Sequence, residues 1–139
     1  MIYLVYRMKL TAHAQRDVAA FWKWATAREE WFYRDLPMVR SVRWYQSVVG
    51  GVYELENWAG FDDIEGFALY RRKVAELRSD PGWERRRVTQ DRWWEFLDTR
   101  LFTDTPLAGR PAVSAAAQAR RPRGSRARPR PRSRDTRTA

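Results

Sequence analysis

The first residues of the chain alternate between two faces, which is the pattern of a β-strand. Over residues 2–10 large apolar side chains occupy one face (Ile2, Leu4, Tyr6, Met8, Leu10), and a mixed set occupies the other (Tyr3, Val5, Arg7, Lys9). A second extended run covers residues 39–49, and a third covers residues 52–58 after Gly50-Gly51, a dipeptide typical of tight hairpin turns. The pattern therefore predicts three strands, of which the second and third are antiparallel neighbours.

Helical periodicity separates these strands. From Ala14 to about Leu36 the apolar residues form one helical stripe that ends before Pro37, comprising Val18, Phe21, Trp22, Ala25, Phe32 and Leu36. A second helix follows an acidic segment and presents Phe67, Tyr70, Val74 and Leu77, and Asp80-Pro81 then supplies the N-cap and first residue of a short third helix. The run 93–102 predicts a fourth strand, with an extension of the preceding helix as the alternative.

The predicted order is β-α-β-β-α-β, the arrangement of α+β domains with a ferredoxin-like antiparallel sheet. Such a sheet carries its helices on one face only. Its other face would expose Tyr3 and Val5, joined by Tyr45 and Trp58, which is too apolar a surface for water. Because most soluble oligomers are symmetric, we expect a second copy to cover this face in a homodimer.

The charge of the chain is concentrated in its last quarter. The 139 residues carry a formal net charge of +10, but ten arginines against two aspartates follow residue 102, so residues 1–102 carry only +2. All 20 aromatic residues lie at or before Phe102. An Arg/Pro/Ala-rich stretch cannot bury enough apolar surface to offset its ordering entropy. We predict a folded domain over residues 1–104 and a disordered tail over residues 105–139.

Two residue types that carry much chemistry are scarce. The chain has no cysteine and one histidine, His13, which excludes disulfides, thiol catalysis and Cys- or His-rich metal sites. No signal peptide and no apolar run of membrane-spanning length is visible. We therefore expect a cytoplasmic protein with no metal and no membrane partner.

The hairpin and the helices after it resemble those of the dimeric α/β-barrel superfamily, in particular NIPSNAP-like and antibiotic-biosynthesis-monooxygenase-like proteins. The matching positions are Tyr53, Glu54, Trp58, Asp62, Asp63, Asp80, Pro81 and Trp83, and the resemblance covers residues 1–102. It implies two ferredoxin-like subunits packed sheet against sheet around a cavity. Members include cofactor-independent monooxygenases of aromatic polyketides, polyketide cyclases, haem-degrading enzymes and proteins of unknown role, so the fold does not settle the chemistry.

The haem-degrading branch of this superfamily fits poorly. Its members carry an asparagine on the first strand, a tryptophan after the third strand and a histidine ligand in the second helix. Here only Trp58 matches, and His13, which precedes the first predicted helix, does not supply the barrel histidine of cyclase-like members. We therefore expect no cofactor.

The candidate ligand-binding residues share the face of the sheet opposite the helices. They are Tyr3, Arg7, Arg43, Tyr45, Glu54, Glu56 and Trp58. In such a site an arginine stabilises a phenolate, a buried glutamate accepts a proton, and aromatic rings stack on a planar ligand. The sequence thus predicts binding of a small aromatic or polyketide-like molecule, with cofactor-independent monooxygenation or cyclisation as the candidate activity.

Two alternatives stay open at this stage. In the first, Arg7 and Arg43 neutralise Glu54 and Glu56 as cross-strand ion pairs, and Trp58 packs in a dimer interface. In the second, the protein is a non-catalytic dimeric module whose polybasic tail binds nucleic acid or other polyanions. That binding would be non-specific, because the tail has charge for phosphates but no aromatic residue for base stacking.

Overall fold

The computed structural model describes residues 1–105 of the chain. Along the sequence the elements are β1 (Ile2–Leu10), α1 (Ala12–Arg16), α2 (Val18–Phe32), β2 (Ser41–Gln46), β3 (Glu54–Phe61), α3 (Ile64–Arg78), α4 (Pro81–Arg87), the 3-10 helix η1 (Val88–Arg92) and β4 (Trp94–Thr103). Among the described residues no helix is both long and apolar enough to cross a membrane. The predicted tail lies, apart from its first residue, outside the described part.

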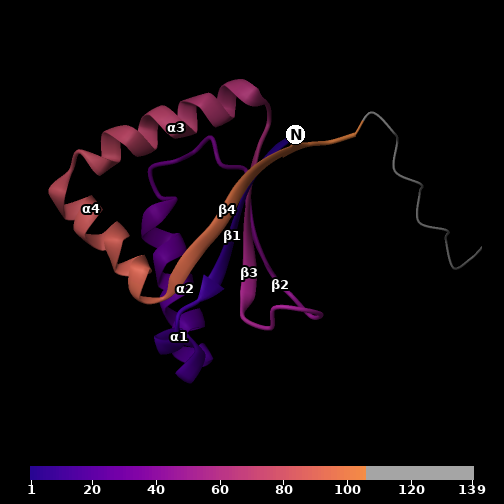
Figure 1. Ribbon diagram of the computed structural model, residues 1–139. Helices are drawn as coiled ribbons and strands as arrows, with labels where there is room; N and C mark the ends of the chain where they lie inside the picture. Colours follow the sequence, from indigo (N-terminus) through magenta and orange to yellow (C-terminus); the bar gives the residue numbers. More distant parts are fainter. Residues whose placement is uncertain (106–139) are drawn as a thin grey trace, which may run out of the picture. The chain divides into compact units, whose positions relative to one another are not determined.

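The four strands form one antiparallel sheet in the order β2-β3-β1-β4. In Figure 1 the helices lie on one side of this sheet, and the other side is left open. The predicted fold class, an α+β ferredoxin-like domain with helices on one face, is therefore confirmed. Pairing of two copies into a barrel stays a prediction.

The core between sheet and helices consists of two clusters. One contains Met8, Leu10, Ala14, Phe21, Ala25, Leu55 and Trp94, and the other contains Leu4, Phe32, Leu36, Ala59, Phe61 and Tyr70. Both draw on β1 and β3 and on the apolar stripe of α2, as the sequence pattern predicts. The tryptophans of α2 pack at the edges of the clusters, half-buried.

Capping explains where the helices differ from the prediction. The continuous helix predicted from Ala14 is two helices, because Asp17 adopts a non-helical conformation (φ −146°, ψ 82°) and accepts a hydrogen bond from the Ala20 amide. Asp63 and Asp80 cap α3 and α4 as expected. The predicted tight turn is instead a loop over residues 47–53, in which Gly50 has a φ of 93° that favours glycine.

A β-bulge divides β4 and was not expected from the sequence. The register with β1 shifts by one residue, so that Leu97 has no partner there. Ahead of the bulge, Trp94 and Phe96 face the helices; beyond it, Asp98 and Phe102 face the opposite side of the sheet. The extra residue, Leu97, thus leaves Trp94 and Phe96 on the helix side of the sheet. It moves Asp98 and Phe102, which uninterrupted alternation would place on that same side, to the other side.

Candidate functional site

All seven predicted site residues lie on the face of the sheet that the helices do not cover, called the outer face below. Its aromatic part centres on Trp58, which stacks on Phe102 with 5.4 Å between ring centroids and 2° between planes. Tyr3 and Tyr45 approach the same indole at 6.0 and 5.7 Å. A hollow of about 440 Å³ opens beside these rings and is also lined by Arg43.

The other predicted residues form an ion-pair cluster around Arg7. Its guanidinium lies 2.7 Å from Asp98 and 3.5 Å from both Glu54 and Glu56. The hydrogen bond to Asp98 raises the pKa of Arg7 above its usual value. The cross-strand ion pairs considered from the sequence are therefore present for Arg7, whereas Arg43 forms none within the described residues. Both glutamates are engaged in this cluster, which weakens their candidacy as free bases.

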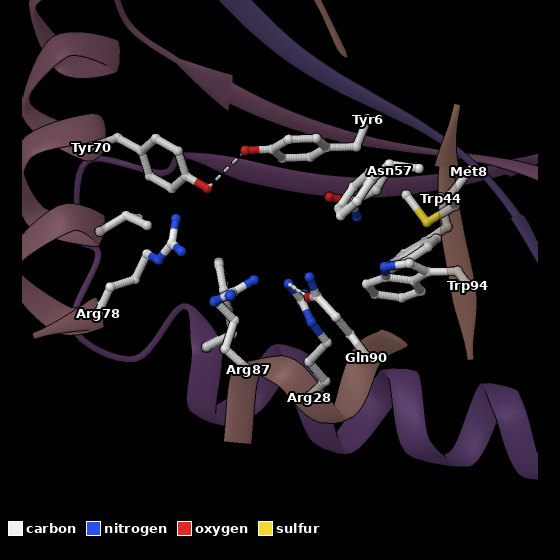
Figure 2. Close-up of a pocket in the computed structure, with 13 residues that line it drawn as sticks. Tyr6, Met8, Arg28, Trp44, Asn57, Tyr70, Arg78, Arg87, Gln90 and Trp94 are labelled. Atoms are coloured by element: carbon white, nitrogen blue, oxygen red, sulfur yellow. Dashed lines mark hydrogen bonds between the residues drawn. The ribbon is translucent and has the colours of Figure 1, made fainter. Parts of the chain in front are cut away.

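A second cavity, of about 210 Å³, lies on the helix side of the sheet where the two core clusters meet (Figure 2). Its walls are apolar and aromatic, and its polar groups are mostly nitrogen donors. The lining residues are Tyr6, Met8, Arg28, Phe32, Trp44, Asn57, Tyr70, Val74, Arg78, Arg87, Gln90, Trp94 and Phe96. None of them was among the predicted site residues.

Arg28 brings a buried positive charge into this cavity. It lies on the buried stripe of α2, with 7% of its surface exposed. Its guanidinium carbon lies 4.0 Å from the ring centre of Phe32 and 5.1 Å from that of Trp94. It donates one long hydrogen bond, 3.4 Å, to Gln90 Oε1 and has no carboxylate partner in the described chain. Burial lowers the pKa of Arg28, which reflects the cost of keeping this charge away from water.

Two further buried donors belong to residues that line the same cavity. Asn57, on β3, accepts a hydrogen bond of 3.1 Å from the Tyr33 hydroxyl at its Oδ1, which fixes the side-chain amide and leaves Nδ2 without a partner. The Trp94 Nε1 and the Arg28 Nε are likewise buried without a protein acceptor. Each unpaired buried donor costs about 1–3 kcal/mol. All three donors belong to residues that line one cavity, and together they offer hydrogen bonds to an acceptor brought close to them.

Two tyrosines at or beside the cavity have raised pKa values. Burial raises the pKa of Tyr33 to about 12 and also raises the pKa of Tyr70. The hydroxyls of Tyr70 and Tyr6 lie 3.5 Å apart, as the dashed line in Figure 2 marks. No carboxylate and no histidine belongs to the described residues that line the cavity. The cavity therefore combines a buried positive charge and hydrogen-bond donors with a described lining that contains no carboxylate or histidine base.

Two residues of this cavity carry a signal in the sequence, although neither was predicted as a site residue. Arg28 stands three residues after Ala25 and four before Phe32, so a charged residue occupies the apolar stripe of α2. Asn57 interrupts the buried face of β3 between Leu55 and Ala59 in the same way. The positions of the β4 aromatic residues depend on the bulge, which no sequence pattern revealed.

Comparison with known proteins supports the fold. An uncharacterised NIPSNAP domain protein from Burkholderia xenovorans aligns over 78% of this chain and 99% of its own, with 16% identity and a TM-score of 0.59. SnoaB from Streptomyces nogalater, a cofactor-independent oxygenase, aligns over 76% of this chain and 94% of its own, with 17% identity and a TM-score of 0.50.

The chain shares its fold with these NIPSNAP-domain and oxygenase structures. The resemblance seen in the sequence is thereby confirmed at the level of the fold. Protein Atu4242 from Agrobacterium tumefaciens is a further example, with 17% identity, a TM-score of 0.57, and coverage of 78% of this chain and 97% of that one. No family model and no curated protein matches the sequence. Proteins with this fold include an oxygenase and uncharacterised members, so function must be argued from the site.

Proposed function

We propose that this protein binds a small planar aromatic compound through an ionised oxygen in the cavity between sheet and helices, and that the bound compound reacts with O₂ without a cofactor. The observation that carries the proposal is the set of three buried N–H donors, from Arg28, Asn57 and Trp94, that lack protein acceptors. A phenolate or enolate oxygen supplies the missing acceptor, and the positive charge of Arg28 favours its ionised form.

The shape of the cavity restricts the ligand. Its volume of about 210 Å³ is below the range of about 300–1,000 Å³ that is common for drug-sized ligands. We therefore assign it a compound of one or two fused rings. The side chains of Tyr6, Tyr70, Trp94 and Phe96 provide aromatic walls for such a ring system.

The proposed reaction needs no electron donor besides the substrate. In a dihydroxynaphthalene, O₂ forms a bond to a ring carbon of the phenolate, and the O–O bond then breaks. One oxygen atom stays as a quinone carbonyl, and the other leaves as water, which takes up the hydrogen of the attacked ring carbon and a proton from solvent that replaces the phenol proton released there. Arg28 and Asn57 hold the oxyanion, and the phenol proton passes to solvent because no described lining residue is a carboxylate or histidine. The same lack of a base favours oxygenation over cyclisation.

Binding is tested by isothermal titration calorimetry with 2-naphthol, and with naphthalene as the control of equal shape that has no oxygen. We expect 2-naphthol to bind at least about tenfold more tightly, the effect of hydrogen bonds to charged or buried donors. The variant Asn57→Leu removes one donor at similar size and should reduce that preference. Equal binding of the two compounds would refute the proposed oxyanion site.

Turnover is tested with 1,8-dihydroxynaphthalene under ¹⁸O₂. The expected product is 5-hydroxy-1,4-naphthoquinone with one ¹⁸O atom, formed without added metal or flavin and faster than in buffer alone. The Arg28→Met variant serves as the matched control and should lose the acceleration. Binding without any acceleration would leave a ligand-binding protein and exclude the oxygenase activity for this substrate class.

A further inference from the structure

Two more arginines line the same cavity at one end. In Figure 2 Arg78 lies below Tyr70 and Arg87 lies between Arg78 and Arg28, whereas Met8 and Trp94 lie at the opposite side of the cavity. Arg78 ends α3 and Arg87 ends α4, so the junction of these helices brings both side chains to the cavity. The oxyanion donors of Asn57 and Trp94 are thus separated from this pair along the cavity.

One carboxylate holds the two arginines together. Glu84 accepts two hydrogen bonds from Arg87, of 2.6 and 2.7 Å, and lies 3.5 Å from the Arg78 Nε. Arg87 lowers the pKa of Glu84, which therefore stays ionised. Asp91 also acts on Arg87 but forms no ion pair in the described chain. Two guanidinium groups share one carboxylate, so this end of the cavity keeps an excess of positive charge.

The two arginines differ in how strongly they are engaged. Arg87 is bound by both oxygens of Glu84, and 20% of its side chain is exposed. Arg78 makes one contact to that carboxylate at 3.5 Å, and 56% of its side chain is exposed. The Arg87 pair lies within α4, and only the long Arg78 contact joins α3 to α4. Arg78 retains free N–H groups at the cavity, and an arginine fork matches the two oxygens of a carboxylate.

We propose that Arg78 and Arg87 bind a carboxylate at the end of the ligand opposite its phenol oxygen. This inference rests on the proposed function and makes it more specific: the substrate class is a hydroxylated bicyclic aromatic acid. Arg28, Asn57 and Trp94 hold the oxyanion, and the arginine pair holds the acid group on the side of the cavity near Tyr70. The ligand is then positioned at two points, which orients its ring for reaction.

Three related compounds test the inference by calorimetry on the full chain. They are 6-hydroxy-2-naphthoate, its methyl ester, and 2-naphthol, which share the ring and the phenol but differ in the acid group. We expect the free acid to bind about tenfold or more tightly than the ester, the usual effect of a charge-assisted hydrogen bond. Equal binding of acid and ester would overturn the inference while leaving the proposed function intact. Failure of all three compounds to bind would overturn both.

Single substitutions test whether Arg78 causes the tighter binding of the acid. Arg78→Gln should bring the acid-to-ester ratio close to one. Arg72→Gln removes an exposed charge from the same helix away from the cavity and should preserve the ratio. Glu84→Gln removes the competing carboxylate and should increase the ratio. An unchanged ratio in Arg78→Gln, or an equal loss in Arg72→Gln, would show that the arginine pair is not the carboxylate site.

Discussion

Replacing Arg28 by methionine is expected to stabilise the protein while weakening its binding of an aromatic oxyanion. Arg28 is 7% exposed, has no carboxylate partner within the described residues and donates one long hydrogen bond to Gln90. Methionine keeps an unbranched side chain of similar length and removes the charge. The change therefore separates the electrostatic role of the residue from its packing.

The expected change in the free energy of unfolding follows from unfavourable burial of the guanidinium charge and favourable contacts of the same group. Burial of an ion without a counter-charge costs several kcal/mol even after relaxation. The stacking on Phe32 and Trp94 returns about 1–2 kcal/mol for each ring, and the long bond to Gln90 about 1 kcal/mol. We expect the Arg28→Met variant to gain about 1 kcal/mol in free energy of unfolding. For a domain of this size the melting temperature would rise by about 4–8 °C.

Thermal and urea unfolding followed by circular dichroism measure this change. Lys23→Met, an exposed substitution on the same helix, is the matched control and should shift the free energy of unfolding by less than about 0.5 kcal/mol. In parallel, 2-naphthol affinity should fall by about tenfold in the Arg28→Met variant only. A loss of more than about 2 kcal/mol of stability with unchanged naphthol binding would show that Arg28 is a structural residue, and it would refute the reasoning.

The remaining predictions concern other parts of the molecule. Burial raises the pKa of Tyr33 from 10.0 to about 12, so the contribution of this residue to the free energy of unfolding is complete below pH 10 and is lost as the pH rises to 12. In Tyr33→Phe, the free energy of unfolding measured with urea should therefore fall less steeply over that pH range. Light scattering should find a dimer, and Phe102→Glu, which places a charge beside Trp58 on the outer face, should give a monomer that still binds 2-naphthol. A chain truncated after residue 105 should keep its fold and naphthol binding but lose retention on heparin, because the removed part carries nearly all of the net charge. A monomeric wild type, or a truncated chain that fails to fold, would contradict the corresponding prediction.

The periodicity of the sequence was sufficient for the fold because β1, β3 and α2 each pack an apolar face into the core. The alternation of Leu4 and Met8 with Arg7, and the aspartate caps of α3 and α4, specify elements that the tertiary structure keeps. The order of these elements then specifies the ferredoxin-like sheet. A break inside a helix was harder to predict. Asp17 divides the helix predicted from Ala14 because its side chain caps the N-terminus of α2.

The site is harder to predict than the fold, because alternation alone does not say which face of a sheet holds a ligand, and both faces of this sheet carry a hollow. Placing the ligand on the outer face followed from the charged and aromatic residues there, yet Arg7 is satisfied by its carboxylates. On the helix face, Arg28 and Asn57 are the residues whose positions in the sequence point to the cavity, because each is a polar residue in a row of buried apolar residues. The cavity also needs the bulge at Leu97, which arises from strand pairing and cannot be seen in β4 alone.

The ionisation of bound 2-naphthol tests the central claim most directly. Naphthol and naphtholate differ in their absorption spectra, so a pH titration of the saturated complex reports the pKa of the ligand inside the cavity. If Arg28 and the unpaired donors stabilise an oxyanion, the pKa of bound 2-naphthol lies below that of the free compound, and this shift disappears in Arg28→Met. A bound pKa equal to or above the free value would contradict the account, because the cavity would then favour the neutral phenol.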